Sequence, residues 1–168
     1  VESKATTSTA AGNAPPDVPG SNDWQYTEGI IQPSVVSLGG KRLRLYARST
    51  SRTGKICVAD SSDAGITWTQ ARPIDVPNPN SGIDAVRCRD GRVVLVYNNT
   101  PRGRSPLNLA VSQDGEHFRM FHTLEDAPGE YSYPAMVQAK NGDLLITYTW
   151  QRKRIRFVRF PLSEIPDR

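Results

Sequence analysis

Short runs of β-branched and aromatic residues, separated by glycine, asparagine, aspartate and proline, fill the chain from residue 23 onward. Each run has the length of a strand, and no segment keeps the apolar spacing of about 3.6 residues that an amphipathic helix needs. Residues 1–22 differ, because Ala, Thr, Ser, Gly and Pro dominate them. Such a segment buries too little apolar surface to offset the entropy lost on ordering. The pattern predicts an all-β domain over residues 23–168, preceded by a flexible linker or extended arm over residues 1–22.

The β-rich part repeats itself every 51 residues. This interval separates three glycines and three tyrosines alike, namely Gly40, Gly91 and Gly142, and Tyr46, Tyr97 and Tyr148. Each glycine belongs to a Gly-Gly, Asp-Gly or Asn-Gly pair, which supplies the positive φ angles of a tight hairpin. A hairpin, a third strand and an outer fourth strand in a unit of this length are typical of a β-propeller blade. We therefore expect three four-stranded blades, about half of a six-bladed propeller, at about residues 23–78, 79–129 and 130–168.

The outer strands are the least regular part of each predicted blade. We expect them at about residues 69–74 and 119–124, whereas the third blade lacks an obvious one and residues 24–27 are a further candidate. Propellers have about four to eight blades, so three blades leave hydrophobic faces that need a neighbour. The expected partner is another half-propeller, either a second copy of this chain or further blades of a longer protein.

Two turns, placed at the repeat interval, contain the same residue types. They comprise Ser61, Asp63, Gly65, Thr67 and Trp68 in the first turn, and Ser112, Asp114, Gly115 and Phe118 in the second. Side chains of Ser and Asp accept hydrogen bonds from turn amides, and glycine permits a positive φ. The pattern Ser-x-Asp-x-Gly-x-Thr-Trp is the Asp box, or bacterial neuraminidase repeat. We expect these residues to stabilise turns and not to take part in catalysis.

With these boxes, the chain resembles the C-terminal half of a sialidase over about residues 28–160. The segment NSGIDAVRCRDGRVVLVYNN is similar to a sialidase segment in which an acidic residue precedes a strand and a hairpin. The segment EYSYPAMVQAKNGDLLITYTW resembles the one that contains the sialidase tyrosine nucleophile. The resemblance implies a propeller whose active site lies at the end opposite the Asp boxes.

Strand order identifies the residues at that opposite end, where first strands begin and second strands end. Gln32 begins the first strand of the first blade, and the catalytic candidates at equivalent places are Tyr131, Asp84, Tyr133 and Glu130. The substrate-binding candidates are Arg48, Asn98, Asn99, Arg102, Arg104, Trp150 and Arg152. Arginine binds carboxylates through a two-pronged fork, so these residues predict an acidic glycan, such as one with sialic acid or a uronic acid.

The resemblance maps Tyr131 onto the nucleophile. A tyrosine hydroxyl has an ordinary pKa of about 10 and needs a base to become reactive. Because neighbouring strand residues point to opposite faces, Asp84 from the adjacent blade is a better candidate base than Glu130. Tyr133 shares the predicted orientation of Tyr131 and is the second candidate nucleophile. Trp150 is either a wall of a pocket or a plug between blades.

Together these residues predict a sialidase-like glycoside hydrolase that acts on a terminal acidic sugar. One departure leaves alternatives open, because Asn98 and Asn99 stand where the family pattern places an arginine. A non-catalytic carbohydrate-binding or assembly module is the first alternative. A polysaccharide lyase is the second, because one fold supports several chemistries.

Charge and composition narrow the range of partners. The chain has 21 Lys and Arg against 17 Asp and Glu, and a net charge of +4 is too small and scattered to predict nucleic-acid binding. No apolar run has the length of a membrane span. Cys57 and Cys88 lack metal-ligand spacing, as do His117 and His122, so we expect no metal and no cofactor. The cysteines are expected to be buried thiols, with a disulfide as the alternative. No signal peptide is visible, and a secreted or periplasmic location is favoured.

Overall fold

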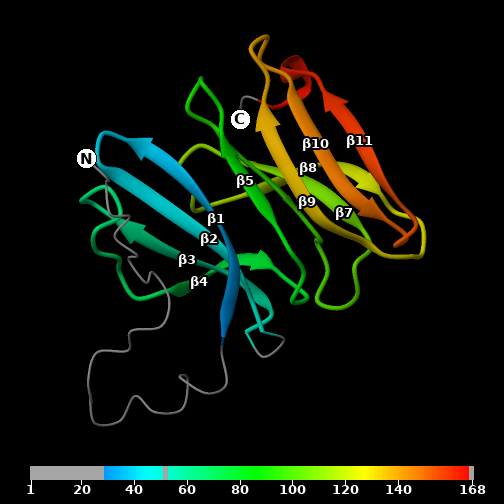
Figure 1. Ribbon diagram of the computed structural model, residues 1–168, viewed down its shortest axis with the longest axis horizontal. Helices are drawn as coiled ribbons and strands as arrows, with labels where there is room; N and C mark the ends of the chain where they lie inside the picture. Colours follow the sequence, from blue (N-terminus) through cyan, green and yellow to red (C-terminus); the bar gives the residue numbers. More distant parts are fainter. Residues whose placement is uncertain (1–28, 51–52, 167–168) are drawn as a thin grey trace, which may run out of the picture.

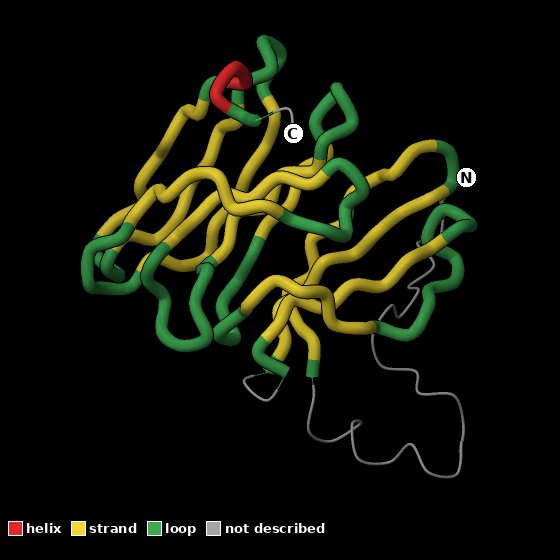
Figure 2. The backbone as a smooth tube through the Cα atoms, turned by 180° about the vertical axis from the view of Figure 1, so that it is seen from behind, coloured by secondary structure: helices red, strands yellow, loops and turns green. Residues whose placement is uncertain are grey.

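The computed structural model describes residues 29–50 and 53–166, in which eleven strands form three antiparallel sheets (Figures 1 and 2). The first sheet contains β1 (Ile30–Gly39), β2 (Arg42–Ser49), β3 (Lys55–Ser61) and β4 (Arg72–Pro77). The second sheet contains β5 (Asp84–Arg87), β6 (Val93–Tyr97), β7 (Leu107–Ser112) and β8 (Arg119–Glu125). The third sheet contains β9 (Tyr131–Gln138), β10 (Leu144–Trp150) and β11 (Arg154–Phe160), and the short 3-10 helix η1 (Leu162–Glu164) follows it.

The three sheets confirm the predicted all-β fold of successive propeller blades, each a meander of neighbouring strands. The expected four strands are present in the first two sheets. Within the described residues the third sheet has three strands, in agreement with the expectation that the third blade lacks an obvious outer strand. The candidate outer strand at residues 24–27 lies outside the described residues. Strand β4 begins at Arg72, later than expected. Before it, the Thr69 amide donates to the Asp60 carbonyl in β3, and the Thr69 hydroxyl accepts a hydrogen bond from the Asp60 amide.

The hydrophobic cores lie between the sheets and not within one of them. Strand β6 explains why, because all five of its residues are buried and alternate residues point to opposite faces. Val93 and Leu95 pack toward the first sheet, and Val94 and Val96 pack toward the third sheet. The second sheet is therefore apolar on both faces, as a middle blade must be.

The two cysteines are buried and form no disulfide, as expected from the sequence. Burial raises the pKa of the Cys88 thiol to about 11. Among the residues that the structure describes, no helix is long and apolar enough to cross a membrane.

Candidate functional site

A cavity of about 290 Å³ opens where the first strands of the three sheets, β1, β5 and β9, lie next to one another (Figure 1). The lining residues come from all three sheets and the segment before β5: Gln32, Pro33, Ser34, Gly82, Ile83, Asp84, Tyr133 and Pro134. The Asp-box turn is at the other end of the strands, because Ala64 donates its amide hydrogen to Lys41 in the β1–β2 hairpin. The cavity is therefore at the end where the sequence places the chemistry.

Asp84 joins the three innermost strands. One carboxylate oxygen, Oδ1, accepts hydrogen bonds from the Ser34 hydroxyl at 2.6 Å and from the Ala85 amide at 2.9 Å. The other oxygen, Oδ2, accepts a hydrogen bond from the Met136 amide at 2.7 Å. These bonds reach from β5 to β1 and β9, so they hold the carboxylate in the wall of the cavity.

Two residues with left-handed backbones flank Asp84. Gln32 has a φ of 51° and Tyr133 a φ of 52°, and each precedes a proline. At both places the strand pairing is interrupted, between Ile31 and Ser34 in β1 and opposite Thr147 to Thr149 in β9. Positive φ is unfavourable for residues with a side chain, and such strain often occurs at functional sites.

The interruption in β9 separates the two candidate tyrosines. Tyr131 is 1% exposed, whereas Tyr133 is 49% exposed. The expectation that they share an orientation is therefore wrong, because the left-handed residue breaks the alternation of an ideal strand. The structure brings Tyr133 and Asp84 into one cavity. Tyr131 packs in the core between the second and third sheets, and its hydroxyl accepts a hydrogen bond from Gln151 at 3.0 Å.

Arg104 lies against the ring of Tyr133. The guanidinium carbon of Arg104 lies 5.1 Å from the ring centre. Arg104 is the main cause that lowers the pKa of the Tyr133 hydroxyl below its ordinary value, and the charges of Arg48 and Arg152 add to the effect. A lowered pKa favours the phenolate, which is the more nucleophilic form.

Glu130 holds two of these arginines in place. Its two carboxylate oxygens accept hydrogen bonds from Arg104 at 3.0 Å and from Arg152 at 2.7 Å. Arg152, followed by Ser132 and Arg104, lowers the pKa of the Glu130 carboxyl. The guanidinium groups of Arg48, Arg104 and Arg152 and the carboxylates of Glu130 and Asp84 together give a formal charge of +1 near Tyr133, although no arginine is among the residues that line the cavity.

Arg48 lies in β2 at the same end of the first sheet. Its Nη1 donates to the carbonyl of Asn80 at 3.3 Å, and its buried Nε has no hydrogen-bond partner in the structure. The Oδ1 atom of Asn80 is also buried without a partner. Buried polar atoms are normally paired, so these two atoms are exceptions among the side chains that the structure describes.

The two asparagines predicted to bind substrate, Asn98 and Asn99, instead form hydrogen bonds to other groups of the protein. Asn98 is fully buried, accepts a hydrogen bond from the Ser81 hydroxyl and donates to the carbonyls of Pro106 and Tyr131. Asn98 therefore connects the segment before β5, the β6–β7 loop and β9, and it is not among the residues that line the cavity. The backbone amide of Asn99, just after β6, donates to the side-chain oxygen Oδ1 of Asn108 in β7.

Like the other predicted binding residues, Trp150 and Arg102 are not among the residues that line the cavity. Trp150 packs against the core between the second and third sheets, and the Arg154 guanidinium stacks on its ring at 4.2 Å. Of the two alternatives predicted for Trp150, this contact matches the plug between blades. Arg102 is exposed in the β6–β7 loop.

At the opposite end, both Asp boxes have the hydrogen bonds expected of turn-stabilising residues. The Asp63 carboxylate accepts bonds from the amide and hydroxyl of Thr67 and from the Ser61 hydroxyl. Those bonds lower the pKa of Asp63 to about 2. The Trp68 indole donates to the carbonyl of Gly65 at 3.1 Å.

In the shorter second box, the Asp114 carboxylate accepts bonds from Ser112 and from the amides of Glu116 and His117. The His117 ring, 2.7 Å from Asp114, takes the place that the threonine occupies in the first box.

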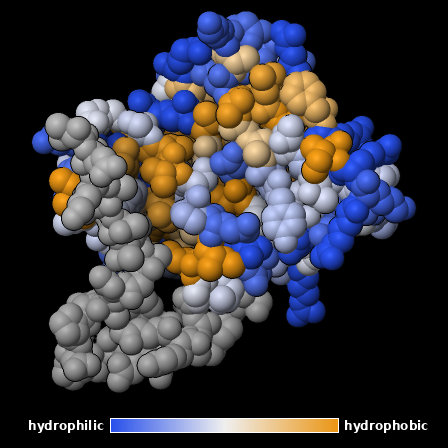
Figure 3. Space-filling model, viewed as in Figure 1, coloured by the Kyte–Doolittle hydropathy of each residue, from blue (hydrophilic) through white to orange (hydrophobic). Residues whose placement is uncertain are grey.

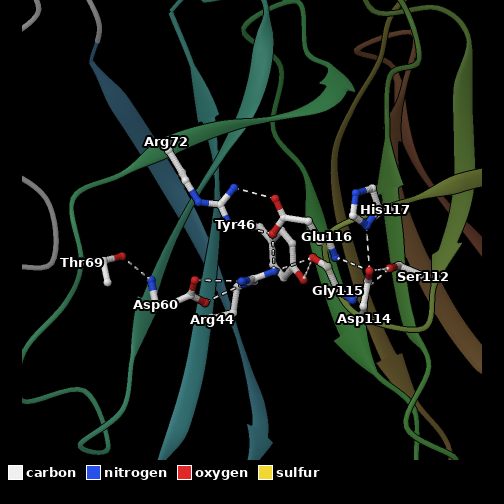
Figure 4. Close-up of polar contacts among 10 residues, drawn as sticks. All are labelled: Arg44, Tyr46, Asp60, Thr69, Arg72, Ser112, Asp114, Gly115, Glu116 and His117. Carbon is white, nitrogen blue, oxygen red and sulfur yellow. Dashed lines mark hydrogen bonds and ion pairs between the residues drawn. The ribbon is translucent and has the colours of Figure 1, made fainter.

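The second box also binds the first sheet (Figure 4). The Arg44 guanidinium lies between the Asp60 carboxylate, at 2.6 Å, and the Glu116 carboxylate, at 2.8 Å. Tyr46 donates its hydroxyl hydrogen to the carbonyl of Gly115 at 2.7 Å. This polar cluster therefore fixes the first two sheets to each other.

Comparison with known proteins agrees with this architecture. A BNR repeat-like domain matches residues 10–146, more than half of the chain. The chain belongs to this family. By sequence, no curated protein matches this BNR repeat-like chain.

Solved structures similar to this BNR repeat-like chain include sialidases. The NanB sialidase of Streptococcus pneumoniae has a TM-score of 0.65 and 22% identity over 80% of this chain and 24% of its own. The intramolecular trans-sialidase of Ruminococcus gnavus has a TM-score of 0.64 and 19% identity over 79% of this chain and 33% of its own. At this identity the likeness shows the fold, and the chain spans a quarter to a third of these proteins.

Several cavity residues were not among the predicted site residues: Pro33, Ser34, Gly82, Ile83 and Pro134. A signal in the sequence does exist, because Gln-Pro and Tyr-Pro stand near the starts of the first strands of the first and third blades. Proline in a strand often marks an interruption of the ladder.

Proposed function

We propose that the chain forms part of the active site of a glycoside hydrolase that acts on a terminal acidic sugar, with Tyr133 as nucleophile and Asp84 as its base. The observation that supports this most directly is the shared cavity of Asp84 and the half-exposed Tyr133, whose pKa the surrounding arginines lower. The sialidase-like fold agrees with the proposal but does not assign these roles.

The choice of Tyr133 over Tyr131 follows from access to the sugar. A nucleophile must approach the anomeric carbon, and Tyr131 is 1% exposed with its hydroxyl bonded to Gln151. Tyr133 lines a cavity whose volume, about 290 Å³, lies near the lower end of small-molecule sites and suits a single sugar ring.

In the proposed reaction, the Tyr133 hydroxyl proton passes to Asp84 as the phenolic oxygen bonds to the anomeric carbon. The glycosidic bond breaks, and the departing oxygen takes a proton from a general acid that this proposal does not assign to the chain. Water then attacks the anomeric carbon and hydrolyses the glycosyl–tyrosine bond. Asp84 returns its proton to the departing Tyr133 oxygen, and the proton released by water restores the general acid. Arg48, Arg104 and Arg152 attract and orient the sugar carboxylate.

A non-catalytic sugar-binding module is the second candidate, and one observation favours it. All hydrogen bonds that Asp84 accepts come from the protein, and they occupy both of its oxygens. Both oxygens thus serve to hold β1, β5 and β9 together, which is a structural role. Binding of an acidic sugar by the same arginines would then occur without hydrolysis.

The discriminating experiment compares the wild type with Tyr133→Phe and Tyr131→Phe on 4-methylumbelliferyl sialoside and 4-methylumbelliferyl glucuronide. We expect Tyr133→Phe to lose at least about 100-fold in kcat, as nucleophile removal does elsewhere, and Tyr131→Phe to stay within a few-fold. The opposite order would reject Tyr133 as nucleophile. Binding of sialic acid or glucuronic acid by a wild type that hydrolyses neither substrate would establish the binding module.

We also propose that another half-propeller covers the open face of the third sheet. Val137, Ile155 and Phe157 are 59%, 68% and 61% exposed. In Figure 3 hydrophobic side chains reach the surface over the first and third sheets. A second copy of the chain and further blades of a longer protein are the two candidate partners, and both would bury this apolar surface.

A further inference from the structure

Gln32 lies beside Tyr133 in the cavity, although the two residues belong to different sheets. A Cβ atom placed on Gly82 would lie 3.4 Å from Oε1 of Gln32 and 3.6 Å from Cδ1 of Tyr133. The two side chains therefore approach the same side of Gly82, one from β1 and one from β9. Building on the proposed function, we infer that the Gln32 amide determines specificity by hydrogen-bonding a neutral hydroxyl or amide substituent of the sugar.

The backbone of Gln32 supports a functional role for its side chain. Its φ of 51° interrupts the β1–β2 pairing between Ile31 and Ser34. Glutamine gains nothing from this conformation, which glycine adopts without cost and asparagine adopts more readily. A left-handed glutamine that lines a cavity places its amide where an extended strand residue would not point.

The chemistry of the amide sets the kind of group that it binds. An amide both donates and accepts hydrogen bonds, is uncharged and cannot take up a proton from Tyr133. The charged groups near Tyr133 belong to segments other than β1. Arg104 and Arg152 both bind Glu130, the residue that immediately precedes β9. Gln32 therefore binds the uncharged part of the sugar, while the arginines bind its carboxylate.

The test uses Gln32→Gly and Gln32→Glu in the full chain, with Ala64→Gly as control. Ala64 also has a positive φ, of 65°, but lies in the Asp-box turn at the other end. Calorimetric titration with free N-acetylneuraminic acid and with glucuronic acid gives Kd, the fluorogenic substrates give KM and kcat, and thermal unfolding gives Tm.

We expect Gln32→Gly to raise Kd and KM about 3- to 10-fold, the effect of one lost neutral hydrogen bond, with a smaller change in kcat. Its Tm should hold or rise, because glycine removes the strain. Gln32→Glu should weaken binding of the acidic sugars further, since it adds a negative charge. Ala64→Gly should leave Kd and KM unchanged.

The outcomes separate this inference from the proposed function. If Gln32→Gly changes only Tm and leaves Kd and KM as in the wild type, the specificity role of Gln32 is overturned. The proposed function still stands in that case, provided that the wild type hydrolyses a substrate. A wild type that binds a sugar without hydrolysis, together with weaker binding by Gln32→Gly, would reject the hydrolase and support Gln32. No binding of either sugar by the wild type would overturn both.

Discussion

At the scale of single residues, close contacts depend on positions without a side chain. Gly115 has a φ of 73°, and a Cβ atom there would lie 2.8 Å from the hydroxyl oxygen of Tyr46. That hydroxyl is the donor that bonds to the Gly115 carbonyl. A glycine at position 115 therefore permits both the positive φ of the turn and the close contact between the first two sheets.

Gly115→Ala should lower the free energy of unfolding by about 2–4 kcal/mol, because it adds left-handed strain and displaces a buried hydrogen bond. Gly103→Ala is the matched control, since Gly103 has a φ of 76° but no atom within 4 Å of the added Cβ. The control should lose about 1 kcal/mol. Urea unfolding measures both, and equal losses would refute the role of the Tyr46 contact.

At the scale of elements, each Asp box holds a turn by bonds to one carboxylate, and polar groups of the second box join two sheets. The Asp63 bonds span a few residues along the chain. The Arg44 bonds connect β2 and β3 with the β7–β8 turn. The first kind of bond depends on local sequence, and the second requires the sheets to be packed.

Asp63 gives a pH-dependent contribution to stability. Its folded-state pKa of about 2 lies below the ordinary value of 3.8, so folding favours the ionised form. The contribution is complete above the unfolded-state pKa and is lost as the pH falls toward 2. Between pH 5 and 2, the unfolding free energy of Asp63→Asn should therefore fall less than that of the wild type. Urea unfolding at several pH values in this range measures both proteins.

Asp75→Asn is the control for that titration, because the Asp75 side chain is 98% exposed. Its profile should follow the wild type. A profile of Asp63→Asn that coincides with both would contradict the contribution assigned to the Asp63 carboxylate.

Arg44→Met should cost about 3 kcal/mol of unfolding free energy, because it leaves two carboxylates near each other without their common partner. The Arg44 side chain is 11% exposed. Lys55→Met removes a solvent-exposed ion pair with Asp75 and should cost less than about 1 kcal/mol. Guanidinium-chloride unfolding of both variants tests the difference, and a loss for Arg44→Met no larger than for Lys55→Met would count against the cluster.

At the scale of the whole molecule, the three sheets bury the faces that they turn toward each other, and the third sheet leaves apolar side chains exposed on its other face. On the third sheet, Ile155 and Phe157 stand on the face away from the core between the second and third sheets. The apolar surface on this face supports the proposed half-propeller partner.

Ile155→Asp combined with Phe157→Asp should abolish self-association, if a second copy covers this face, because it places charges in an apolar interface. Light scattering of the wild type after size exclusion should then show a dimer, and the double variant a monomer. Monomers for both proteins would exclude the second copy and leave further blades as the partner. A dimer that survives the double substitution would place the interface elsewhere.

The sequence predicted most of the fold because its evidence is periodic or local. Hairpin glycines such as Gly91 and Gly142 have the expected positive φ angles. The prediction of the site was less complete. It selected Asp84 and Tyr133 as candidates, preferred the buried Tyr131, and included Asn98, which has no exposed surface.

The sequence alone determined the 51-residue repeat, the hairpins and the Asp boxes, because each depends on φ preferences and hydrogen bonds within a few residues. The tertiary structure decided which tyrosine faces the cavity and what Asp84 binds. The partners of Asp84 in β1 and β9, Ser34 and Met136, are 50 and 52 residues away along the chain. Strict alternation along β9 would have given both tyrosines one orientation. Only the packed sheets, with a left-handed residue at Tyr133, bury one tyrosine and expose the other.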